Sequence, residues 1–178
     1  MKRFKLRSSI INPFFFKGLL VVFLFQIVSC SKETPSPSYT KVSIDNVTIL
    51  NFPNNNAGVT WDNALEGYDP DVYFKITNAG LSTVLYDAGS GSMIQNLTIS
   101  ALPYYWYNTN GSAIYTHNNL SQAIDIDLYD YDIASADKYM GSTTFNFSSY
   151  TTGSNKYPSS ATVTNGSMSI QLELSWLP

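Results

Sequence analysis

Residues 123–147, AIDIDLYDYDIASADKYMGSTTFNF, decide the fold expected of this chain. Ile124, Ile126 and Leu128 fall on one face of an extended segment, whereas Asp125 and Asp127 fall on the other and are expected to face solvent. A second alternating run follows Gly141. The pattern therefore predicts two strands joined by a polar loop.

The loop between these strands carries Asp130, Asp132, Ser135 and Asp137. Carboxylates at positions i and i+2 leave an extended backbone on the same side, with their Cα atoms about 7 Å apart. Such a cluster repels itself unless a positive charge sits in it, and a hard cation with carboxylate ligands is the natural occupant. The alternative is a solvated polar loop that binds nothing.

Short alternating segments continue along the rest of the chain. Composition agrees with a β-rich protein, because 15% of the residues are aromatic, only 13% are charged, and no long helical run appears. We predict an all-β antiparallel sandwich of roughly eight strands. The expected strands outside 123–147 are 42–50 (with a bulge at Asp45-Asn46), 72–76, 82–87, 93–99, 113–116 and 168–176.

The first 30 residues are typical of an export signal. Five of the ten basic residues precede residue 30 and all thirteen acidic residues follow it, so the remainder carries 5 − 13 = −8 and nucleic acid is excluded as a partner. An apolar run from Gly18 to Phe25 leads into Gln26-Ile-Val-Ser-Cys30, which resembles the bacterial lipobox. That resemblance implies a signal peptide over 1–29, lipid on Cys30, a tether over 30–40, a domain over 41–178, and a place in the bacterial cell envelope, at the outer membrane.

A second acidic loop, with Asp62, Asp69 and Asp71, precedes the strand at 72–76. DPDVYFKI and LYDYDIASADKYMG together resemble the calcium loops of the C2 domain over most of residues 41–178. The resemblance implies a C2-like sandwich that binds calcium. The ligands it implies are Asp62, Asp69, Asp71, Asp130, Asp132, Ser135 and Asp137. Lys138 stands where the family usually has its last acidic ligand, and Asp62 and Asp137 are each shifted by one residue.

No catalytic motif is legible, and His117, the only histidine, is expected in a solvated loop. We therefore predict a non-catalytic, calcium-binding lipoprotein in which calcium clamps loops or bridges to anionic lipid or an envelope protein. The alternative is a carbohydrate-binding lipoprotein, in which Tyr105 and Trp106 of the run Tyr104–Tyr107 stack on a glycan. The same run would equally suit a strand with alternate residues in the core.

Overall fold

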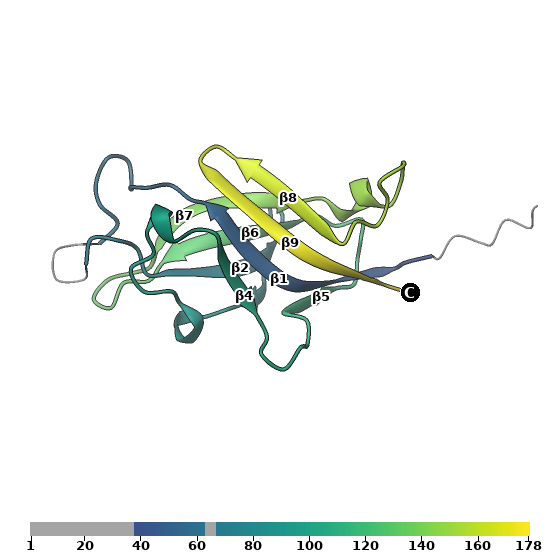
Figure 1. Ribbon diagram of the computed structural model, residues 1–178, viewed down its shortest axis with the longest axis horizontal. Coiled ribbons are helices and arrows are strands. Elements are labelled where there is room, and N and C mark those ends of the chain that lie inside the picture. Colours follow the sequence, from purple (N-terminus) through teal and green to yellow (C-terminus); the bar gives the residue numbers. More distant parts are fainter. Residues whose placement is uncertain (1–37, 63–66) are drawn as a thin grey trace, which may run out of the picture. The chain divides into compact units, whose positions relative to one another are not determined.

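Two antiparallel β-sheets packed face to face form the part of the chain that the computed structural model describes, residues 38–62 and 67–178 (Figure 1). One sheet has the strand order β4-β1-β9-β8, with β5 also paired to β1, and the other has the order β3-β2-β6-β7. The predicted antiparallel sandwich is confirmed, with nine strands where about eight were expected. The signal peptide and Cys30 lie outside the described residues.

The strands are β1 (Lys41–Asn51), β2 (Val72–Asn78), β3 (Val84–Asp87), β4 (Tyr104–Tyr107), β5 (Tyr115–His117), β6 (Ile124–Asp130), β7 (Lys138–Phe145), β8 (Ser160–Asn165) and β9 (Met168–Leu177). Three short 3-10 helices complete the described elements, at Ser90–Ser92, Ile99–Ala101 and Phe147–Tyr150. Within the described ranges no helix is long and apolar enough to cross a bilayer.

Alternate residues of both sheets fill the space between them. In β6, Ile124, Ile126 and Leu128 are completely buried, as their spacing predicts. The facing sheet contributes the same alternation from β1 and β9, with Val42, Ile44, Val47, Ile49, Ile170 and Leu172 all fully buried. The described core lies entirely within the compact unit that ends at Pro178, so this unit has the apolar interior it needs to fold by itself.

Four register shifts interrupt the ladders of the described strands, among them one within β1 and one within β7. In β1 the pairing with β9 shifts between Ile44 and Asn46, where the parity break at Asp45-Asn46 predicted it. In β7 the pairing with β6 shifts so that Gly141 lies opposite Leu128 but Tyr139 lies opposite Tyr129. Gly141 has φ +145°, a conformation that favours glycine. The shift puts Lys138 opposite Asp130.

Two segments differ from their predicted structure. Residues 93–99 form no strand, because β2 is already paired with β3 and β6, and only Val72 at its end is left to form a bridge with Ile94. Strand β8 was not predicted, since its sequence SATVTN has only one buried residue, Ala161, and little apolar alternation.

Candidate metal centre

Three aspartates from two distant parts of the chain meet at one end of the sandwich. Asp130 is the last residue of β6, Asp132 follows it in the β6–β7 loop, and Asp62 comes from the loop after β1. One carboxylate oxygen from each lies within 4.8 Å of the others. All three side chains are buried, with exposed fractions of 4% for Asp62, 0% for Asp130 and 8% for Asp132. Among the described residues, this is the group whose donors could converge on one ion.

Lys138 places its ammonium group in this aspartate cluster. It is the first residue of β7 and is paired with Asp130 across the ladder. Its Nζ donates to Asp132 Oδ1 at 2.8 Å, to the Trp61 carbonyl at 2.9 Å and to Asp130 Oδ2 at 3.4 Å. The lysine therefore neutralises part of the buried negative charge, at the position where the C2 resemblance implied an acidic ligand.

Hydrogen bonding within the cluster is uneven. Asp130 is well satisfied, because its Oδ1 also accepts the backbone N–H of Asp71 at 3.0 Å. Among the described residues, in contrast, neither buried carboxylate oxygen of Asp62 has a hydrogen-bond partner, and the buried Oδ2 of Asp132 has none either. Buried polar atoms without a partner are costly, so these three oxygens mark a position where a proton or a cation would be stabilised.

The electrostatics of the cluster follow from burial and crowding. Burial, together with the charges of Asp130 and Asp71, raises the pKa of Asp62 from 3.8 to about 6. Burial also raises the pKa of Asp130, even though the Asp71 N–H and the Lys138 ammonium act in the opposite direction. The pKa of Lys138 is raised: burial lowers it, but the hydrogen bond to Asp132 and the two carboxylate charges outweigh that effect.

The remaining predicted ligands serve other contacts. Asp137 accepts the Tyr73 hydroxyl at 2.6 Å and the Asp132 backbone N–H at 3.3 Å, so it braces the loop. Asp71 accepts the Asn96 backbone N–H at 2.8 Å. Ser135 is exposed on the wall of the groove above the cluster, and Asp69 is half-buried outside the group of three aspartates.

An open groove leads to the cluster from solvent. Its volume is about 550 Å³, and Trp61, Asp62, Asp132 and Lys138 are among the residues that line it. Val59, one of its lining residues, has 66% of its surface exposed, and Ile133, which lies in sequence between the lining residues Asp132 and Ala134, has 78% exposed. An ion could reach the carboxylates through this groove without disturbing the core.

The aromatic run proposed for a glycan alternates across β4. Trp106 points inward, where it packs against Phe74 with ring centroids 5.0 Å apart and donates its indole N–H to the Ser92 carbonyl. Tyr105 and Tyr107 are exposed. Of the two residues proposed to stack on a sugar, only Tyr105 therefore presents its ring to solvent.

His117 is not in a solvated loop as predicted. It ends strand β5, only 4% of its surface is exposed, and its Nε2 lies 2.9 Å from the Gln122 carbonyl. Its ring also contacts Phe147. The polar neighbours of His117 in THNNLS suggested exposure, but pairing of β5 with β1 draws the residue into the interior.

Comparisons with known proteins give structural matches only. No protein-family model matches the chain, and no match is found among curated proteins. The structure of human GIVD cytosolic phospholipase A2 in complex with methyl gamma-linolenyl fluorophosphonate is similar at 12% identity and a TM-score of 0.46, over 79% of this chain but only 18% of that one. A C2 domain of plant extended synaptotagmin 1 is similar at 10% identity and a TM-score of 0.40, over 80% of this chain and 98% of that one.

Proposed function

We propose that this protein is a non-catalytic, C2-like module that binds calcium through Asp62, Asp130 and Asp132. The observation that carries the proposal is Asp62, whose two oxygens are buried without a partner beside two further carboxylates. Calcium accepts six to eight oxygen ligands in flexible arrangements, and carboxylates are its preferred side-chain ligands in proteins. Three aspartates supply up to six such oxygens, and the Trp61 carbonyl, which faces Lys138 Nζ, could add another.

Lys138 competes with calcium for two of the three carboxylates. Its ammonium holds Asp132 and Asp130, so an ion that uses these carboxylates has to displace it. The side chain is 33% exposed and long enough to swing into the groove, which makes displacement feasible. We therefore expect weak binding, in the range of extracellular calcium modules, ~10⁻⁴–10⁻³ M.

A second candidate follows from the same lysine. With Nζ 2.8 Å from Asp132 and 2.9 Å from the Trp61 carbonyl, Lys138 ties the first acidic loop to the second without any metal. The cluster would then be a permanent internal clamp, and the domain would bind its partners through another surface.

A calcium titration separates these two functions. The melting temperature of a protein of residues 38–178 is measured in EDTA and, in separate samples, in calcium at up to tens of millimolar. Magnesium at equal ionic strength is the control. Calcium at a hundred times Kd should add about 2.7 kcal/mol to the free energy of unfolding. Magnesium should add little, because it requires a tighter octahedral shell. Identical melting curves in EDTA, calcium and magnesium would favour the lysine clamp.

We further propose that the domain is held at the outer membrane of a bacterial envelope by lipid on Cys30. The proposal rests on the order of features at the start of the sequence: basic residues, an apolar run, then Val-Ser-Cys30. In a Triton X-114 partition of cells the wild type should enter the detergent phase, whereas Cys30→Ser should give either a protein in the aqueous phase or one with an uncleaved leader. A wild type that carries no lipid and has its mature terminus at another residue would contradict the anchor.

In the proposed role calcium connects the loops to a partner. A portion of the chain with a net charge of −8 is repelled by anionic lipid, so contact with such a surface or with an acidic envelope protein needs a bridging cation. The exposed Val59 lines the groove where such a surface would approach, and the exposed Ile133 lies in sequence between two residues of that lining.

A further inference from the structure

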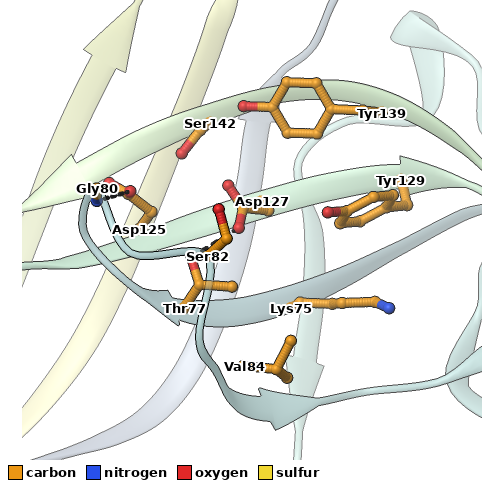
Figure 2. Close-up of a pocket in the computed structure, with 10 residues that line it drawn as sticks. All are labelled: Lys75, Thr77, Gly80, Ser82, Val84, Asp125, Asp127, Tyr129, Tyr139 and Ser142. Atoms are coloured by element: carbon orange, nitrogen blue, oxygen red, sulfur yellow. Dashed lines mark hydrogen bonds between the residues drawn. The ribbon is translucent and has the colours of Figure 1, made fainter.

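The outer face of the β3-β2-β6-β7 sheet carries a second groove, away from the aspartate cluster. It has a volume of about 340 Å³, within the ~300–1,000 Å³ typical of small-molecule sites. Figure 2 shows its floor, formed by outward-facing residues of β2, β6 and β7, and one wall formed by the turn after β2. Lys75, Thr77, Asp127, Tyr129, Tyr139 and Ser142 line it, together with four others.

A carboxylate lies in the floor of this groove. Asp127 was expected to face solvent, and it does lie on the outer face, but neighbouring side chains leave only 8% of its surface exposed. The Thr77 hydroxyl donates to its Oδ2 at 2.8 Å and so fixes its orientation (Figure 2). Asp125 beside it accepts the Gly80 N–H from the turn, which ties the groove wall to the floor.

Tyrosines line the side of the groove opposite this turn. These are Tyr129 and Tyr139, whose ring centroids lie 5.7 Å apart. The buried Tyr73, outside the lining, stacks on Tyr129 with a centroid distance of 5.5 Å. Tyr139 is 55% exposed, so its ring is available to a ligand. Burial raises the pKa of the Tyr139 hydroxyl, which therefore stays protonated and able to donate.

The charge in the groove is mixed. Lys75 lies over the Tyr129 ring at 5.1 Å and pairs with Asp87 at 3.1 Å. Asp127 would attract a cationic ligand but Lys75 would repel it. An anionic ligand would be attracted by Lys75 and repelled by Asp127. A ligand with many hydroxyls can donate to Asp127, accept from the tyrosine and serine hydroxyls, and lay its C–H face on Tyr139.

We propose that this groove is a saccharide-binding site, with Asp127 as the principal acceptor and Tyr139 as the stacking ring. It differs in place from the Tyr104–Tyr107 run, which belongs to the other sheet. It needs no calcium, since none of its lining residues belongs to the aspartate cluster. The proposal therefore stands independently of the calcium function.

The test uses residues 38–178 on an array of neutral and acidic oligosaccharides in EDTA, followed by calorimetry with the best-bound sugar. Tyr139→Ala and Asp127→Asn should each weaken binding by about tenfold or more, as expected for a lost ring face or charged acceptor. Tyr105→Ala, an equally exposed tyrosine on β4, is the matched control and should leave binding unchanged. Melting temperatures of the three variants confirm that each is folded.

Three results would overturn the proposal. The first is an array on which no saccharide binds. The second is loss of sugar binding in Tyr105→Ala but not in Tyr139→Ala, which would move the site to β4. The third is tighter binding of spermine than of any sugar, abolished by Asp127→Asn, which would make the groove a cation site.

Discussion

Lys138→Gln is expected to lower the free energy of unfolding by roughly 3 kcal/mol in EDTA at pH 7. Removing one partner of a buried ion pair typically costs ~3–5 kcal/mol, because the other charge stays buried without compensation. Here the side chain of Asp130 is fully buried and that of Asp132 nearly so, whereas 33% of the Lys138 side chain is exposed. Because water partly screens the lysine, we expect a loss at the lower end of this range. Urea unfolding at fixed pH measures it.

Calcium should reverse much of this loss. Without the ammonium, no internal cation competes for Asp130 and Asp132, so Lys138→Gln should bind calcium more tightly than the wild type and recover stability as calcium is added. Lys75→Gln is the matched control, because its ion pair with Asp87 is on the surface and should contribute less than about 1 kcal/mol. A loss no larger than that of the control would mean that Lys138 is only a rim charge.

Asp62→Asn is expected to stabilise the metal-free protein at pH 7. The pKa of Asp62 is about 6 in the folded state against an ordinary 3.8, and this difference corresponds to a penalty of about 3 kcal/mol on the ionised folded form. The sign follows from the raised pKa: the folded state holds the proton more tightly, so stability falls as pH rises from about 4 to 6 and stays low above it. The variant lacks this fall, and its gain should vanish near pH 4.

In saturating calcium the order of the two stabilities should reverse. The wild type should then be more stable than Asp62→Asn, because the variant has lost an ionised ligand. Urea unfolding at several pH values, with and without calcium, gives all four stabilities. Asp45→Asn is the control: its carboxylate is only half-buried and accepts the Ser175 hydroxyl, so no comparable gain is expected. A destabilised Asp62→Asn in EDTA would show that its carboxylate has a favourable partner in the folded protein.

The strands were predictable where apolar residues alternate without interruption. β6 and β9 have that pattern, and their inward faces are buried as expected. β8 lacked a clear pattern because its inward side carries only the small Ala161 and the half-buried Val163. Residues 93–99 had apolar residues but pair with β2 only through the Val72–Ile94 bridge. Edge availability depends on the whole sheet, so local sequence does not determine it.

The aspartate cluster was also predictable in part, where its residues belong to or directly follow a strand of regular alternation. Asp130 and Asp132 follow directly from strand phase, and Asp62 was placed near them by the resemblance of its loop. The entry of Lys138 was not predictable from alternation, because a regular β7 would turn this residue away from Asp130. Asp137 was expected to share its oxygens with an ion, but the Tyr73 hydroxyl, from a strand far away in the sequence, already occupies one of them.

The bulge in β7 has a consequence for how this protein can evolve. The conformation of Gly141 keeps Lys138 toward the buried aspartates and Tyr139 toward the outer groove. A residue with a side chain at position 141 would favour regular pairing, which exchanges the faces of Lys138 and Tyr139. A residue other than glycine at position 141 should therefore disturb the aspartate cluster and the outer groove together, although Gly141 belongs to neither.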